Sequence, residues 1–472
     1  MNKDFSQTPR PTFKRALRRI SVISVVISMT LVWLLLSTAS IFTLKQYAQK
    51  NLELTAATMG RSLEAALVFG DSAAAEETLA SLGKQGQISQ AIVLNGQMQH
   101  FAAWRHEPLA NKEQVSGLIS KWLFPEPTVQ PIWHQGKQIG ELRLTALDEL
   151  ISHFLGISIL VLTGSILLAS FIALLLTPFG VSDNTGNTAW LKFPFLPFSI
   201  GPAEVVKITF TLLLAKQLEW LREVKRDLKS FPSALMVAGH TIALMGWYVG
   251  ISGDMGNGLT FFFIFLCMAF VAGFALRWFV LLFAGSGAAI AASVALGLMP
   301  DYMINRFRVL FDHSYDTLGA GWQQTRGLLA LGSGGLFGQG YMQGTQTQAG
   351  EGSLPARHTD FIFCVCGEEL GMIGCLVVIA LLAAIIIRVL LVARRAETPF
   401  HCYVCVGVAA MLIFQTVVNI GMCLFVMPVI GLTLPFFSYG GSSLLTLYAA
   451  MGVVSGIKKR SPVVRRPGRP LG

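Results

Sequence analysis

The chain alternates long apolar runs with shorter polar connections along most of its length. A helix needs roughly 18 to 25 apolar residues to cross the hydrocarbon core of a bilayer, and several runs approach or reach that length. We expect about nine spans, near residues 20–44, 153–177, 203–216, 233–250, 259–275, 278–299, 361–389, 403–427 and 436–457. The pattern predicts an all-α polytopic membrane protein.

One long segment, residues 45–152, departs from this pattern and holds ordinary polar residues. The stretch Leu52–Leu67 is amphipathic, whereas Ala91–Leu94 and Ile139–Leu144 are strand-like. We therefore expect a small α+β domain between the first two spans. A span, an external domain and a second span form the layout of a bacterial sensor input, so the domain is predicted to be periplasmic and sensor-like.

Composition supports a membrane protein, because 53% of the residues are hydrophobic and 13% are charged, about half the charge of a soluble domain. The net charge of +10 does not indicate nucleic-acid binding, since the basic residues lie at the ends of apolar runs. This arrangement predicts a multi-pass protein of the bacterial inner (cytoplasmic) membrane, in contact with membrane lipids. The seven cysteines lie mostly in apolar segments and are expected to be free. Cys402 and Cys405 lack a second ligand pair, so no metal site is predicted.

Basic clusters give conflicting information about sidedness. Residues 1–19 are basic and predict a cytoplasmic N-terminus before the first span. Two spans then return the chain to the cytoplasm near residue 178. Later basic clusters occur at Lys216–Lys229, Arg277, Arg388–Arg395 and Lys458–Arg469. All of them can be cytoplasmic only if residues 178–202 lie outside the cytoplasm. The conflict predicts a junction of two unrelated parts.

The second part begins with this junction, residues 178–202, which is rich in Gly, Pro, Asn and aromatic residues. A transmembrane bundle over 203–457 and a basic tail over 458–472 follow. Inside the bundle, the connection 300–360 contains the glycine-rich stretch Gly332–Gly340. Such a long connection is usually functional. The stretch lacks the Gly-Lys-Ser/Thr ending of a phosphate-binding loop, so that motif is rejected.

The most informative stretch is Arg357–Phe363, which places Asp360 at the edge of an apolar segment, behind Arg357 and His358. A charge near hydrocarbon is costly, so such an acid is a candidate functional residue. The alternative is an acid at a helix N-terminus, where the helix dipole favours it.

Three further groups carry candidate chemistry. Glu204 and Lys207 are three residues apart on one helical face and form either a functional pair or a structural ion pair. Asp254 lies in a glycine-loosened break between spans, which could be a simple turn. Glu369 follows within the span after Asp360, and the stretch 431–443 supplies hydroxyl side chains, among them Ser438 and Ser442.

Taken in order, these motifs resemble the SEDS family of bacterial membrane proteins, which includes FtsW, RodA and SpoVE. The resemblance covers about residues 187–460 and rests on Pro202–Lys207, Asp254–Gly256, Asp316–Trp322, Gly332–Gly340, Gly344–Gln346, Leu354–Phe363, Glu368–Gly374 and Gly431–Ser443. The chain departs from the family pattern at Gly201, Gly253, Met255 and Ala356-Arg357, and the family's first three spans are not matched.

The resemblance implies a peptidoglycan glycosyltransferase that polymerises lipid II, usually beside a class B penicillin-binding protein. It places the catalytic aspartate at Asp360, as general base for the attacking sugar hydroxyl. The candidates for substrate binding are Glu204, Lys207, Asp254, Arg306, Arg308, Arg357, His358, Glu369, Ser438 and Ser442. Arg306, Arg308, Arg357 and Lys207 are the cations expected near the departing pyrophosphate. A divalent cation could share that task, although no ligand cluster demands one.

The first part, about residues 10–177, resembles the CHASE-type sensor half of diguanylate cyclases of the DgcN type. Matching stretches are Arg10–Arg18, Leu44–Leu52 and Ser152–Phe154. The cyclase motif does not follow, so no cyclic di-GMP synthesis is expected. Three alternatives to a polymerase remain open: a non-enzymatic sensor or scaffold, a lipid flippase, and an inactive fusion of a sensor half with a truncated SEDS protein.

Overall fold

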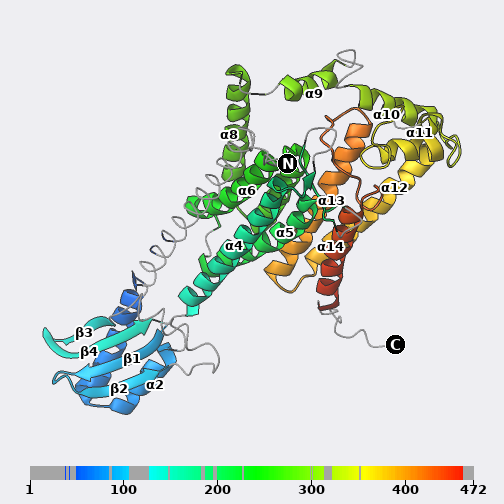
Figure 1. The fold of residues 1–472 in the computed structure, drawn as a ribbon. Helices are drawn as coiled ribbons and strands as arrows, with labels where there is room; N and C mark the ends of the chain where they lie inside the picture. Colours follow the sequence, from blue (N-terminus) through cyan, green and yellow to red (C-terminus); the bar gives the residue numbers. More distant parts are fainter. Residues whose placement is uncertain are drawn as a thin grey trace, which may run out of the picture. The chain divides into compact units, whose positions relative to one another are not determined.

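The computed structural model describes residues 38, 42, 49–50, 52–83, 88–105, 127–146, 149–181, 187–194, 199–225, 228–297, 299, 301–312, 321–349 and 352–460 (Figure 1). The chain divides into two compact units, residues 30–160 and residues 161–472 together with 1–29. The expected first span, residues 20–44, lies outside the described residues except for residues 38 and 42, and so does most of the basic tail.

The smaller unit is an α+β domain, as the sequence predicts. Its four-stranded antiparallel sheet has the order β2-β1-β4-β3. The strands are β1 (Ile88–Asn95), β2 (His100–Arg105), β3 (Thr128–His134) and β4 (Lys137–Ala146). A helix over 52–69 and α2 (Ser72–Gly83) contribute Leu63 and Leu79 to a core shared with Val93 and Leu142, all with no exposed surface. Both strand-like pieces predicted from the sequence lie in this sheet, in β1 and β4.

The larger unit is a helical bundle. Eight of the nine predicted spans fall on its helices: α4 (Glu149–Ala173), α5 (Pro202–Trp220), α6 (Phe231–Ser252), α7 (Met255–Ala272), α8 (Leu276–Ala295), α12 (Ile362–Arg394), α13 (Pro399–Cys423) and α14 (Gly441–Arg460). Five of these, α6, α7, α8, α12 and α13, are long and apolar enough to cross a membrane on their own composition. Helix α13 is central and packs against α5, α7, α12 and α14.

Several helix termini lie together at one end of the bundle, which is called the site end from here on. Helices α5, α7, α12 and α14 begin there, whereas α6 and α13 end there. Two hydrogen bonds link termini across this end: Gly201 N donates to Ser442 Oγ (3.4 Å), and Thr188 N donates to Ser252 O (3.1 Å). The junction is a small hairpin at the same end, in which β5 (Gly180–Val181) pairs with β6 (Trp190–Leu191).

Helix α4 is packed into this bundle through a buried stripe. Val161, Ser165, Leu168, Ala169 and Ile172 recur at helical spacing, and each is less than 9% exposed. The stripe is joined to α6 by hydrogen bonds that advance in the same direction along both helices: Ser165 Oγ lies 2.8 Å from His240 Nε2, and Trp247 Nε1 donates to Ala169 O (3.0 Å). From Val161 onward, helix α4 therefore runs parallel to α6, toward the site end.

The connection 300–360 is not a plain loop, because it contains α9 (Asp301–Phe311), α10 (Trp322–Ser333) and the single turn α11 (Thr345–Gln348). Its glycine-rich stretch packs against a break in α12 at Gly371, whose φ is 71°. Gln339 N donates to Glu368 O (2.9 Å), and Met372 N donates to Gly335 O (2.9 Å). A Cβ on Gly334 would overlap Gly367 O, so only glycine permits this approach. The loop satisfies backbone groups that the break frees.

Candidate functional site

Asp360 lies one residue before the N-cap of α12, which is Phe361. It follows a tight turn in which Ala356 O accepts hydrogen bonds from Thr359 N (3.1 Å) and Phe361 N (3.2 Å). Ala356 has a positive φ of 51°, a conformation that costs a non-glycine residue about 1–3 kcal/mol and persists where its surroundings hold it. Asp360 is thus not itself the cap residue, and the turn holds it at the start of the span.

The backbone around Asp360 is fixed by two distant segments. Asn419 Nδ2, on α13, donates to Asp360 O (2.8 Å) and to Leu432 O (2.7 Å). Ser438 Oγ donates to Thr359 O (2.6 Å) and accepts from Leu434 N (2.8 Å). The sequence marks Ser438 as a candidate for substrate binding; the structure shows a hydroxyl that is 3% exposed and braces the aspartate turn.

The Asp360 side chain is partly exposed and faces the segment Val429–Leu432. Its Oδ2 lies 3.8 Å from the position a Cβ would take on Gly431, a glycine with a φ of 71°. Arg306, on α9, reaches the same segment, and its Nη1 donates to Val429 O (2.9 Å). A carboxylate and a guanidinium thus both lie beside one short stretch of backbone.

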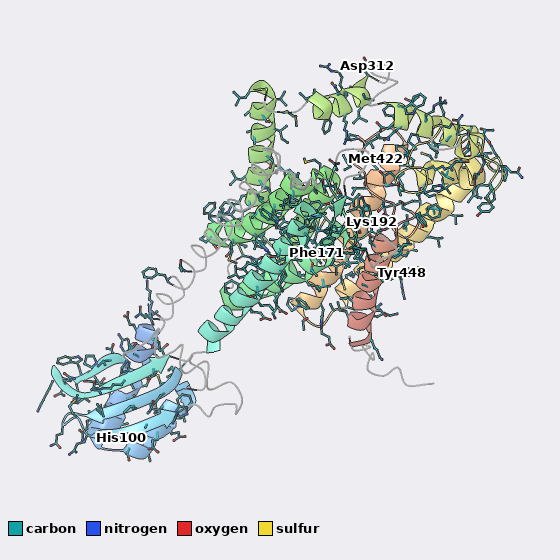
Figure 2. The ribbon with its side chains drawn as sticks, in the orientation of Figure 1. His100, Phe171, Lys192, Asp312, Met422 and Tyr448 are labelled. Carbon is teal, nitrogen blue, oxygen red and sulfur yellow. The ribbon has the colours of Figure 1, made fainter. Side chains whose placement is uncertain are left out.

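The far side of this segment meets α7. The Cβ position of Gly256 lies 2.3 Å from Ile430 O, so the helix terminus packs directly on the segment that faces Asp360. Met422 Sδ, on α13, accepts from Ile430 N (3.2 Å), and Met422 is labelled in Figure 2. The segment is therefore held between α7 and α13.

Asp254 caps α7 and is held by α6. Its Oδ1 accepts from Asn257 N (3.1 Å), and its Oδ2 accepts from Asn257 Nδ2 (2.8 Å) and from Tyr248 OH (2.9 Å). Tyr248 is also within electrostatic range of Glu204. Asp254 thus serves as a helix cap that also accepts a hydrogen bond from α6.

Glu204 and Lys207 form an ion pair, with Lys207 Nζ 2.8 Å from Glu204 Oε1. The lysine has no exposed surface, whereas the glutamate side chain is 12% exposed. Lys207 is therefore buried inside the bundle, and only Glu204 of the pair reaches the solvent-exposed surface. Ser442 lies at the same end and accepts from Gly201 N, one residue before α5 begins.

The remaining candidates are arranged around the turn and the loop. Arg357 donates through Nη1 to Thr347 O and through Nε to His358 Nε2 (3.2 Å). Arg308 is exposed on α9. Glu369 is 6% exposed, and its carboxylate accepts from Met342 N (3.0 Å) and Thr347 Oγ1 (3.1 Å). Glu369 is placed as an anchor for the loop, away from the Asp360 carboxylate turn.

Several supporting residues were not singled out from the sequence. Glu368 has no exposed surface and accepts from Gln346 N (2.7 Å) and Thr347 N (2.9 Å) at the start of α11. Gln324, on α10, donates to Met422 O (3.2 Å) and Met427 O (2.8 Å). Asn419 could have been found as an amide inside an otherwise apolar span. The seven cysteines are all free, as the sequence predicts.

Comparison with known proteins agrees with both resemblances. The family model described as a cell cycle protein, FtsW/RodA/SpoVE, matches residues 151–462, so the match includes α4 and begins earlier than the sequence motifs do. The CHASE8 periplasmic sensor domain matches residues 44–145. Diguanylate cyclase DgcN of Escherichia coli (strain K12) is 59% identical over 177 residues, which cover 38% of this chain and 43% of that protein. The chain thus spans less than half of that relative.

Relatives that match the bundle include two glycosyltransferases. Peptidoglycan glycosyltransferase MrdB of Escherichia coli (strain K12) is 36% identical over 280 residues, covering 58% of this chain and 71% of that protein. The probable peptidoglycan glycosyltransferase FtsW of Coxiella burnetii (strain RSA 493 / Nine Mile phase I) is 34% identical over 301 residues, covering 62% and 77%.

A solved structure, titled for the structural coordination of polymerization and crosslinking by a peptidoglycan synthase complex, superposes with a TM-score of 0.51 at 30% identity. The match covers 64% of this chain and 81% of that one. Spanning helices, family and periplasmic sensor domain together indicate a multi-pass inner membrane protein. The chain belongs to the FtsW/RodA/SpoVE family and carries a CHASE8 sensor domain ahead of its family bundle.

Proposed function

We propose that the chain is a peptidoglycan glycosyltransferase that polymerises lipid II into glycan strands, with Asp360 as its general base. The observation that carries the proposal is the placement of Asp360. Its backbone is fixed by Asn419 and its carboxylate oxygen faces Gly431, on the segment that Arg306 binds. The names of its relatives MrdB and FtsW supply the reaction class.

In the proposed step, a sugar 4-hydroxyl attacks the anomeric carbon of a second lipid-linked sugar. A new glycosidic bond forms, the bond to the lipid pyrophosphate breaks, and the hydroxyl proton passes to the Asp360 carboxylate. The pyrophosphate leaves with the bonding electron pair, and nearby cations stabilise its growing charge. Arg306 is the best placed of the predicted cations, because it already reaches the Val429–Leu432 segment. Lys207 acts through Glu204, since it is fully buried.

The remaining predicted residues have supporting roles in this proposal. Asp254 caps α7, Ser442 binds the backbone just before α5, and Glu369 and Ser438 hold the loop and the aspartate turn. Arg308, Arg357 and His358 are candidates for contact with the lipid pyrophosphate. A class B penicillin-binding protein is the proposed partner, because the structural neighbour comes from a complex that couples polymerization to crosslinking.

The test is polymerisation of labelled lipid II by the purified full chain and by Asp360→Asn. A general base contributes roughly 100- to 10,000-fold, so the variant should lose at least that lower factor. Asp312→Asn is the matched control, because Asp312 is exposed at the end of α9 (Figure 2). Equal activity of the Asp360→Asn and Asp312→Asn variants would show that Asp360 is not the general base. Lipid transfer across vesicles without chain growth would favour a flippase, and binding without either activity would favour a scaffold.

A second experiment tests sidedness, because lipid II is polymerised outside the cytoplasm. Ala349→Cys probes the site end and Lys458→Cys the basic end; both positions are exposed. Labelling of intact cells with a membrane-impermeant maleimide should reach residue 349 and spare residue 458. The reverse pattern would rule out polymerisation by the fused chain and support an inactive fusion.

A further inference from the structure

Helix α8 stands apart from the rest of the bundle. None of its residues is buried, although it is apolar and long enough to span a membrane. It touches its neighbours mainly through aromatic pairs, such as Phe270–Phe279 and Phe262–Phe283, with ring centroids 6.2 and 6.4 Å apart. A helix held this loosely leaves space against α6 and α7.

That space is a cavity of about 230 Å³ between α6, α7 and α8. Every side chain that lines it is apolar or aromatic, including Phe231, Ala238, Phe265, Trp278 and Leu282. The cavity lies where α6 and α8 begin and α7 ends, which is the end of the bundle opposite Asp360. An apolar hollow beside a spanning helix suits a hydrocarbon chain.

The rim of the cavity carries positive charge and an interfacial aromatic residue. Arg277 Nη2 and Trp278 Nε1 both donate to Lys229 O, at 2.9 and 3.0 Å. The Arg277 guanidinium lies 4.9 Å from the Trp278 ring centroid, and both Arg277 and Lys229 are exposed. Tryptophan and basic residues in this arrangement are typical of the headgroup layer of a membrane.

We infer that this cavity is a binding site for an anionic phospholipid, with one acyl chain between α6, α7 and α8 and its phosphate at Lys229 and Arg277. The charge of the rim selects an anionic headgroup over a zwitterionic one. Basic pockets between spans on the cytoplasmic side bind anionic lipids for the same reason. The bound lipid fills the gap beside α8 and holds the helix against α6 and α7.

The inference is tested with the full chain in detergent, by native mass spectrometry during titration with dioleoyl phosphatidylglycerol or dioleoyl phosphatidylcholine. The unmodified chain should retain the phosphatidylglycerol preferentially. Lys229→Ala/Arg277→Ala should weaken that binding roughly 30-fold, since each surface cation contributes about 1 kcal/mol, or about fivefold. The matched control is Arg394→Ala/Arg395→Ala, two cations at the same end but on α12, and it should bind normally.

Ala238→Phe fills the cavity and should abolish retention of the lipid. If that variant does not fold, quenching of Trp278 by phosphatidylglycerol with brominated acyl chains gives the same information. The unmodified chain should be quenched more than Trp278→Phe. Equal affinity for the two lipids, or equal binding by the two double variants, would overturn the inference. An unquenched Trp278 without lipid binding would also overturn it and leave a partner's transmembrane helix as the occupant. None of these measurements depends on lipid II polymerisation.

Discussion

Replacement of Glu204 by Gln would leave Lys207 without its charged partner inside the bundle. The ammonium lies 2.8 Å from the carboxylate and has no exposed surface. Removal of one partner of a buried ion pair costs about 3–5 kcal/mol, because the other charge remains desolvated. The same helix offers a matched pair at the same spacing, Lys216 and Glu219, which are 2.7 Å apart with the lysine side chain 33% exposed. The Glu219 side chain is 10% exposed, so the two pairs differ mainly in the lysine, and a lysine that stays in contact with solvent loses only about 0–1 kcal/mol with its partner.

The assay is thermal unfolding of the full chain in detergent, for Glu204→Gln, Glu219→Gln and Glu204→Gln/Lys207→Met. Each kcal/mol corresponds to roughly 2–4 °C in a domain of 150–250 residues, and on that scale Glu204→Gln should lower the midpoint by about 6 °C or more. Glu219→Gln should lower it by less than about 4 °C. The double variant removes both charges and should recover most of the loss. Equal shifts for the two Gln variants, or no recovery in the double variant, would refute the reasoning.

Two further substitutions test how the site end is held together. Gly256→Ala places a Cβ 2.3 Å from Ile430 O and should both lower the unfolding midpoint and impair polymerisation. The control is Gly250→Ala, whose Cβ would have nothing within 4 Å and which should be neutral or slightly stabilising. Equal impairment by the two variants would contradict this prediction. His240→Leu removes the partner that lies 2.8 Å from Ser165 Oγ and should cost about 1–3 kcal/mol, seen as a lower midpoint in the same assay. An unchanged midpoint would show that the hydrogen bond does not secure α4.

Much of the architecture is readable from the sequence, because a bilayer allows few solutions. Backbone groups in hydrocarbon must bond within their own segment, so a long apolar run predicts a helix. Eight of the nine predicted spans are helices in the described residues, and both predicted strand pieces lie in one sheet. The glycine-rich residues 332–340, conspicuous in the sequence, approach the α12 backbone closely at its break.

The roles of individual polar residues could not be predicted in the same way. Ser438 is conspicuous in sequence, yet its hydroxyl braces the turn before Asp360. Glu369 is a candidate for substrate binding in the sequence, but its carboxylate anchors the loop. Asn419, within an apolar run, supports the backbone of Asp360. The same hydroxyl, carboxylate or amide can either support the fold or bind substrate, and only its neighbours in the folded chain decide between these roles.

The sequence by itself determined the spanning helices, the separate α+β domain and the family motif around Asp360, because these depend on local pattern and composition. Tertiary structure decided what Asp360 faces. Its neighbours Arg306 and Gly431 come from distant parts of the chain, and both depend on the path of residues 429–432 between α7 and α13. That path follows from side-chain packing and long-range hydrogen bonds, which no local pattern specifies. Structure also decided that α4 is joined to the bundle, through Ser165 and His240, since partners so far apart in sequence meet only in the folded chain.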